Sequence, residues 1–206
     1  MSDDHNGPQS GSATPLELLR TPPPKERADA ARNRAAILDA AARLFNEHGV
    51  DAVSMDQVAA AAGVGKGTLF RRFGDKAGLA AALLDARERE LQQGILSGPP
   101  PLGPGASDPE RLVAFADAYL DYAFAYLPLL RMSETASPGA RYRIGAYRFW
   151  TRHIAILLPR NEDPEHAAHA LMAMLDAELL TALLPELGEE RIRSGVRRMW
   201  TNAGRG

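Results

Sequence analysis

The segment SMDQVAAAAGVGKGTLFRRFGDK, residues 54–76, constrains the fold more than any other part of the chain. Ser54 and Gln57 have the spacing of a capping box, in which each side chain accepts a hydrogen bond from the other residue's backbone amide at the start of a helix. Gly63 can adopt a positive φ and end that helix. A second, short helix is expected over residues 66–73. The segment therefore predicts a helix-turn-helix.

The second helix of this motif has an apolar side and a basic side. Leu69 and Phe73 are four residues apart, so both point towards the first helix. The other side carries a lysine, a threonine and two arginines, namely Lys66, Thr68, Arg71 and Arg72. A short exposed helix of this kind, supported by a preceding helix, has the geometry that enters the major groove of DNA.

Two other interpretations of the segment are less consistent with its residues. Residues 65–68, GKGT, resemble the end of a phosphate-binding loop, but such a loop needs a glycine at position 60 and a preceding strand. Position 60 is Ala60, in an alanine-rich stretch that favours helix. The motif could also be a helical hairpin with solvated arginines. Against this, residues 65–76 hold four basic residues and one acid, whereas the whole chain has a net charge of −2.

Residues 32–84, about a quarter of the chain, resemble the N-terminal domain of the tetracycline-repressor (TetR) family of bacterial transcription regulators. The matching residues include Ile37, Leu38, Ala41, Leu44, Phe45, Gly49, Ser54, Val58, Ala59, Ala62, Gly63, Val64, Lys66, Gly67, Thr68, Leu69, Phe70, Phe73, Lys76 and Leu79. The resemblance implies an all-helical homodimer with a DNA-binding head and a ligand-binding body.

The resemblance also implies which residues contact DNA. The groove-facing positions of the family fall on Lys66, Gly67, Thr68 and Arg72, with Arg71 beside them, and its phosphate contacts fall on Ser54, Phe70 and Lys76. The family usually has tyrosine at position 70, and Phe70 lacks the hydroxyl that would contact a phosphate. We therefore expect Phe70 to keep a packing role only.

The composition limits the remaining possibilities. The chain has 206 residues and no cysteine, which excludes disulfides, thiolate metal sites and cysteine nucleophiles. No apolar run is long enough for a secretory signal or a membrane span, so we expect a cytoplasmic protein. No Gly-x-Ser-x-Gly motif or other catalytic constellation is present. We expect neither an enzyme nor a cofactor.

The expected organisation is a disordered arm, a head and a body. Residues 1–25 are poor in apolar side chains and are expected to be disordered. Residues 26–74 form the predicted DNA-binding domain, whose first helix runs over residues 28–48. Residues 75–206 form the predicted ligand-binding and dimerisation domain, with a flexible Pro/Gly-rich loop at 97–109.

Helices of the body are delimited by Asp-Pro and proline signals. Asp108 is expected to cap a helix that Pro128 ends, and a short helix follows over residues 129–133. Pro138 is expected to begin a longer helix that Pro159 ends. Asp163 is expected to cap the next helix, and Pro185 and Gly188 separate it from the last one.

Aromatic residues with polar tips on two of these helices suggest an effector pocket. Each hydroxyl or imidazole needs a hydrogen-bond partner if it is buried, and several such groups in one apolar region are typical of a small-molecule site. An ordinary aromatic core is the alternative for any single residue. The predicted pocket residues are Tyr119, Tyr122, Tyr126, Tyr142, Phe149, Trp150 and His153.

The last two helices are apolar over a wide face, which favours a symmetric partner. Burial within the body alone is the alternative. The predicted interface residues are Leu171, Leu175, Leu179, Leu183, Ile192, Val196, Met199 and Trp200.

His166 and His169 have a spacing that can bind a metal, but no third ligand is evident, so no metal site is predicted.

The sequence thus predicts a homodimeric regulator that binds palindromic double-stranded operator DNA and is released by an unidentified small-molecule effector, as a repressor would be. The alternative is a helical bundle that binds a small molecule, or an enzyme, in which the helix-turn-helix is only structural.

Overall fold

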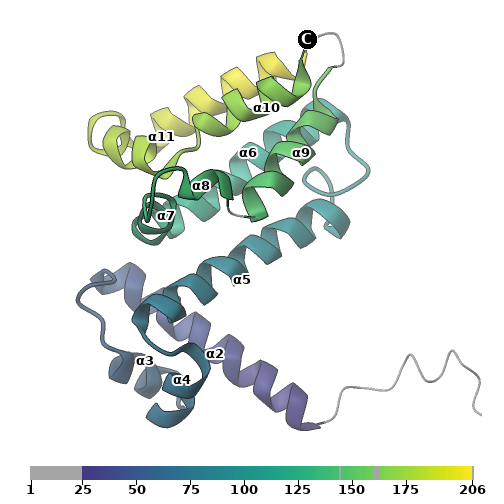
Figure 1. Ribbon diagram of the computed structural model, residues 1–206. Helices are drawn as coiled ribbons and strands as arrows, with labels where there is room; N and C mark the ends of the chain where they lie inside the picture. Colours follow the sequence, from purple (N-terminus) through teal and green to yellow (C-terminus); the bar gives the residue numbers. More distant parts are fainter. Residues whose placement is uncertain (1–24, 144, 160–162, 206) are drawn as a thin grey trace, which may run out of the picture.

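The computed structural model describes residues 25–143, 145–159 and 163–205, and over these residues the fold is all-helical, as predicted (Figure 1). The predicted disordered arm lies, but for Lys25, outside the described residues. Three helices form the head: α2 (Lys25–His48), α3 (Met55–Ala61) and α4 (Lys66–Phe73). The remaining helices are α5 (Lys76–Ser97), α6 (Asp108–Ala125), α7 (Leu127–Glu134), α8 (Ala140–Arg143), α9 (Gly145–Leu157), α10 (Pro164–Ala173) and α11 (Ala177–Ala203).

The helix-turn-helix has the local structure that its sequence predicts. The amide of Gln57 donates to Oγ of Ser54 at 3.3 Å, and the amide of Ser54 donates to Oε1 of Gln57 at 2.8 Å, so the capping box is complete. Gly63 has a φ of +65°, a conformation that favours glycine, and it turns the chain between α3 and α4. Leu69 is fully buried, and Phe73 packs against the same core.

Helix α5 connects the head to the body (Figure 1). Asp75 caps it by accepting a hydrogen bond from the amide of Gly78 at 2.8 Å. The helix contacts α2 and α4 in the head and α6 and α7 in the body. Its buried residues are spread along its whole length, from Leu79 to Ile95. One helix therefore contributes to both cores.

The body packs α6 against α9 and α11, and α9 against α10. The largest side chains of its core are aromatic: Phe115, Trp150 and Trp200 are each at most 2% exposed. The cap of α6 differs from the prediction. Ser107 is the N-cap and forms a capping box with Glu110, while Asp108 is the first helical residue.

Two predicted helices of the body are interrupted. The helix expected from Pro138 is divided into α8 and α9. The leucine row of residues 171–183 crosses the boundary between α10 and α11, which are bent by 50°. At this bend Asp176 begins a new helix by accepting from the amide of Leu179 at 2.9 Å. Gly188, with a φ of +72°, interrupts α11 where a helix boundary was predicted.

The Pro/Gly-rich connection between α5 and α6 folds into a compact turn, although its composition predicts a flexible loop. The amide of Gly103 donates to the carbonyl of Pro99 at 3.0 Å, and Leu102 packs against Gly94 of α5. Among the described residues no single helix is long and apolar enough to cross a membrane; α10 and α11 meet that criterion only when joined across their bend.

Candidate nucleic-acid interface and ligand groove

The outer side of α4 is accessible along its whole length. Lys66, Gly67, Arg71 and Arg72 are exposed, and Thr68 is half-exposed. Two of the cations already have partners: Lys66 forms an ion pair with Asp56 of α3, and Nη1 of Arg72 donates to the carbonyl of Ala30 in α2 at 2.6 Å. Arg71 makes no ion pair or hydrogen bond with any described residue. Its guanidinium is therefore the one on α4 that is most accessible to an anion.

Phe70 is 44% exposed, so the packing role expected for it is wrong. Its ring lies on the same accessible helix as the basic residues. The neighbouring Leu69 supplies the buried contact instead, because it is fully covered.

Ser54 and Lys76, the two predicted phosphate contacts, both have structural partners. The hydroxyl of Ser54 donates to Oε1 of Gln57 at 2.9 Å within the capping box. The ammonium of Lys76 donates to the carbonyls of Val50, Asp51 and Val53, at 2.8, 3.2 and 3.2 Å. A phosphate contact by Lys76 stays a prediction, and it would have to displace one of these carbonyl groups.

The predicted pocket residues do not form one cavity. Tyr119, Trp150 and His153 are buried in a packed aromatic core, in which the ring of Phe115 lies 5.7 Å from that of Trp150 and 5.5 Å from that of His153. Tyr142 is 59% exposed, and its ring packs edge-on against Tyr147. The sequence predicted that Tyr119, Trp150 and His153 are buried, but not that their rings pack against Phe115 and one another.

Burial, together with the smaller effect of the positive charge of Arg111, lowers the pKa of His153 to about 4. Nε2 of His153 has no hydrogen-bond partner among the described residues. The imidazole is therefore neutral near pH 7 and packs in the core against Phe115.

A groove of about 590 Å³ lies beside this core, between α5, α7 and α9. Phe149 is the one predicted pocket residue in its lining. Helix α5 contributes most of the wall, including Asp85, Glu88 and Arg89. Tyr122 of α6 is buried and is not among the residues that line this groove, but its hydroxyl donates to Oε1 of Glu88 at 3.3 Å. Tyr126 instead lines a hollow between α2 and α6.

Glu88 is a functional candidate that the sequence did not suggest. Burial raises its pKa to about 7, and the charges of Asp85 and Glu134 act in the same direction against the hydrogen bond from Tyr122. Its sequence context, DARERE, is that of a solvated helix face. Only the packing of α6 and α7 against α5 places this carboxyl group in a groove.

A buried ion pair joins two of the short helices of the body. Glu134 of α7 pairs with Arg141 of α8, and both side chains are at least 90% buried. Nη2 of Arg141 also donates to the carbonyl of Met172 at 2.8 Å, and Glu134 accepts from the amide of Ala177 at 3.0 Å. Both charges are thus hydrogen-bonded, as buried charges must be. The pair fixes α7 and α8 to the bend between α10 and α11.

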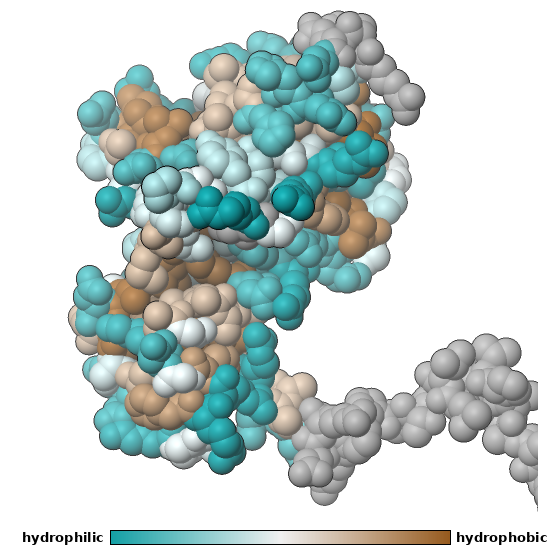
Figure 2. Space-filling model, viewed as in Figure 1, coloured by the Kyte–Doolittle hydropathy of each residue, from teal (hydrophilic) through white to brown (hydrophobic). Residues whose placement is uncertain are grey.

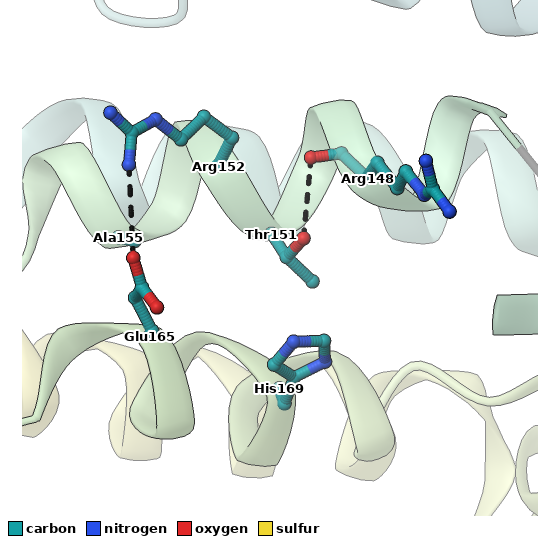
Figure 3. Close-up of a pocket in the computed structure, with 6 residues that line it drawn as sticks. All are labelled: Arg148, Thr151, Arg152, Ala155, Glu165 and His169. Atoms are coloured by element: carbon teal, nitrogen blue, oxygen red, sulfur yellow. Dashed lines mark hydrogen bonds and ion pairs between the residues drawn. The ribbon is translucent and has the colours of Figure 1, made fainter.

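A second, smaller hollow of about 230 Å³ lies between α9 and α10 (Figure 3). Arg152 of α9 faces Glu165 of α10 across it at 3.9 Å. His169 also faces the hollow, and its Nδ1 is 2.8 Å from the hydroxyl of Tyr147. Over the described residues, no three histidine, aspartate or glutamate side chains lie close enough together to hold a metal ion.

Most of the predicted interface residues are buried within one chain. Leu175 and Trp200 are 0% exposed, so they cannot contact a partner, and the prediction is wrong for them. Leu171, Ile192 and Val196 are at most 8% exposed, so they too belong to the core of the chain. Leu179 and Met199 remain 41% and 55% exposed, and Leu183 is half-buried. Figure 2 shows hydrophobic surface on both flanks of the body, including the side on which α11 bends.

Comparison with known proteins gives one family. Residues 37–83 match the profile described as bacterial regulatory proteins, tetR family. A helix-turn-helix-type transcriptional regulator of Staphylococcus aureus (strain USA300) is 47% identical over 53 residues. This alignment covers 26% of the chain and 29% of the length of that relative. The family match therefore covers most of the head and the first turns of α5.

Solved structures match over head and body together, and they show the fold alone. A TetR-family transcriptional regulator of Rhodococcus covers 84% of this chain and 98% of its own, with a TM-score of 0.63 and 22% identity. A transcriptional regulator of Saccharomonospora viridis, in complex with choline, covers 84% and 95%, with a TM-score of 0.64 and 22% identity. A TetR-family regulator of Pectobacterium atrosepticum gives a TM-score of 0.61 at 24% identity, covering 84% and 93%.

We predict that Lys76→Met destabilises the head, because the loop carbonyls of residues 50–53 lose their shared donor while the apolar stem is kept. Hydrogen bonds to a charged group contribute about 1.5–3 kcal/mol, so the free energy of unfolding should fall by that amount. Urea denaturation followed by circular dichroism measures it. Lys66→Met, at an exposed lysine, is the control, and equal losses in the two variants would contradict the structural role of Lys76.

We also predict a pH dependence of stability from His153. Its pKa is about 6.5 in the unfolded chain and about 4 in the folded protein, so below pH 6.5 only the unfolded chain gains a proton. Stability should therefore fall by about 3 kcal/mol between pH 6.5 and pH 4. His153→Leu should lack this component, and Glu88 contributes equally to both proteins. Parallel pH profiles of unfolding for the two proteins would contradict the prediction.

Proposed function

We propose that this chain, which belongs to the tetR family of bacterial regulatory proteins, regulates transcription by binding DNA through α3 and α4. One observation carries the proposal: α4 presents accessible basic side chains on a complete helix-turn-helix whose sequence matches the family over residues 37–83. The family is one of regulators, so no catalytic role is assigned. A regulator of this kind acts on chromosomal DNA, which is consistent with a cytoplasmic location.

In this proposal α4 enters the major groove. Lys66, Gly67 and Thr68, at its N-terminal turn, lie where side chains of such a helix contact base edges. Arg71 contacts a phosphate, because it has no partner within the described protein. Arg72 donates to the carbonyl of Ala30 and so supports the orientation of α4 on α2. Its other terminal nitrogen, Nη2, can donate to a phosphate. Phosphate contacts position the protein, whereas base contacts specify the sequence.

The effector site in this proposal is the groove between α5, α7 and α9. Helix α5 forms most of the groove wall and also contacts the head, where Nη2 of Arg87 donates to Oδ1 of Asp39 in α2 at 2.7 Å. A ligand that shifts α5 would therefore move the head. The structural relative of Saccharomonospora viridis, which holds choline, supports small-molecule binding by this fold. The protein is a repressor if the ligand-bound form has the lower affinity for DNA.

The functional unit in this proposal is a homodimer that recognises a palindromic operator, because two-fold symmetric proteins match two-fold symmetric DNA. The surface proposed to contact the partner includes Leu179, Leu183 and Met199 on α11, the predicted interface residues that are at least partly exposed in the single chain.

The alternative function is a helical bundle that binds a small molecule and has a purely structural helix-turn-helix. It predicts no specific DNA affinity.

We predict that Arg71→Ala weakens binding to the DNA upstream of the protein's own gene and lowers its salt dependence. One phosphate contact contributes about 0.9 to the slope of log K against log salt, so two subunits should lose about 1.8. Thr68→Ala should change the preference among DNA sequences instead. Fluorescence anisotropy between 50 and 300 mM salt measures both effects, with Arg198→Ala on the body as the control. Wild-type affinity in the double variant Lys66→Ala/Arg71→Ala would exclude α4 as the recognition helix.

We predict that Leu179→Glu combined with Met199→Glu converts the dimer to a folded monomer, since two exposed apolar side chains become charged without disturbing the core. Light scattering coupled to size-exclusion chromatography gives the mass. Leu96→Glu, at a residue 60% exposed near the end of α5, should leave the dimer intact. A monomeric wild-type protein at micromolar concentration would refute the dimer.

A further inference from the structure

The groove between α5, α7 and α9 holds one carboxyl group without a basic partner. Asp85 is paired with Arg89 at 2.8 Å, and Glu134 is paired with Arg141. Glu88, which is half-buried in the groove wall, receives only the hydroxyl of Tyr122, at 3.3 Å, from the described residues. A partly desolvated carboxylate that lacks a counter-ion is unfavourable, and a bound cation would offset its charge.

One aromatic side chain lines the groove together with Glu88, and further aromatic rings pack beside it in the core. Phe149 lines the groove opposite α5, and its ring packs edge-on against Trp150 with centroids 5.3 Å apart. On the α6 side, the rings of Tyr122 and Tyr119 are 5.7 Å apart, and Tyr119 in turn contacts Trp150 at 6.3 Å. Aromatic faces attract cations, and the attraction increases when water is excluded. The combination of aromatic rings and one carboxylate suits ammonium groups that carry apolar substituents.

We propose that the groove selects an organic cation, with Glu88 as its counter-ion and Phe149 as its aromatic wall. The inference rests on the proposed effector site and adds the chemical class of the ligand. An anion would be repelled by the negative charge of Glu88, and Arg89 is already paired with Asp85. The hydroxyl of Tyr122 donates to Glu88 and so restricts the position of its carboxylate.

The ionisation of Glu88 gives the site a pH signature. Burial raises its pKa to about 7, whereas a bound cation requires the ionised form. Affinity for a permanent cation should therefore be about tenfold lower at pH 6 than at pH 8. The charged and titratable groups around Glu88 are Asp85 and Arg89 of α5, Tyr119 and Tyr122 of α6, Glu134 of α7 and Arg141 of α8. The lining residues from α9, Gly145, Ala146 and Phe149, carry no charge.

Two probes of the same shape test this inference in the full-length protein by isothermal titration calorimetry. They are 3-hydroxyphenyltrimethylammonium, a permanent cation, and 3-tert-butylphenol, which has carbon in place of the charged nitrogen. The wild-type protein should bind the cation about 10- to 100-fold more tightly at pH 8. Glu88→Gln should lose this preference and its pH dependence while it binds the phenol unchanged. Glu190→Gln, at an exposed acid of α11, should behave as wild type. Ala81→Trp, which fills the groove from α5, should weaken both probes.

The outcomes separate the possibilities. Retained cation preference in Glu88→Gln would overturn the role of Glu88, and equal binding of the two probes by the wild type would overturn cation selectivity. Binding of neither probe by the wild type would overturn the inference too. In each of these cases the proposed regulatory function is tested separately, by measuring the binding of the protein to operator DNA. Glu88→Gln is isosteric and removes a desolvated charge, so it should fold, which circular dichroism verifies.

Discussion

The structure depends on α5, which is buried in the head at one end and in the body at the other. Leu79 and Leu83 of this helix are fully covered beside α2 and α4, and Ile95 is 2% exposed at the body end. Burial of each such side chain stabilises the folded state by about 1.5–3 kcal/mol. Both the head and the body are therefore firmly attached to α5. Because α5 is one continuous helix, the head and the body are joined without a linker between them.

Polar contacts at two positions complement this apolar attachment. Arg87 of α5 binds Asp39 of α2, and Lys76 at the start of α5 binds the loop carbonyls that precede α3. The first turn of α5 therefore organises the loop that leads into the helix-turn-helix. This use of Lys76 explains why a basic residue is needed there independently of any phosphate.

The body combines a densely packed aromatic core with polar groups at its edge. Phe115, Trp150 and Trp200 fill the centre, so the open volume lies outside them, against α5. Buried charges occur where short helices meet: Glu134 and Arg141 join α7 and α8 to the bend before α11. These polar contacts specify how the short helices are arranged. Contacts between leucine and alanine side chains alone would not define that arrangement.

The sequence by itself determined the head and several of the helix ends. Capping residues such as Ser54, Asp75 and Asp163, together with the positive φ of Gly63, act through hydrogen bonds within three or four residues, so local sequence is sufficient to predict them. Tertiary structure alone decided the body and its groove. Burial depends on which helices meet, so Leu175, within a regular leucine row, became core, whereas Tyr142 became exposed. Glu88 reads as a solvated residue in its own helix and gains its position only because α6 and α7 cover α5. A periodic pattern shows which face of a helix is apolar, but not which neighbour covers that face.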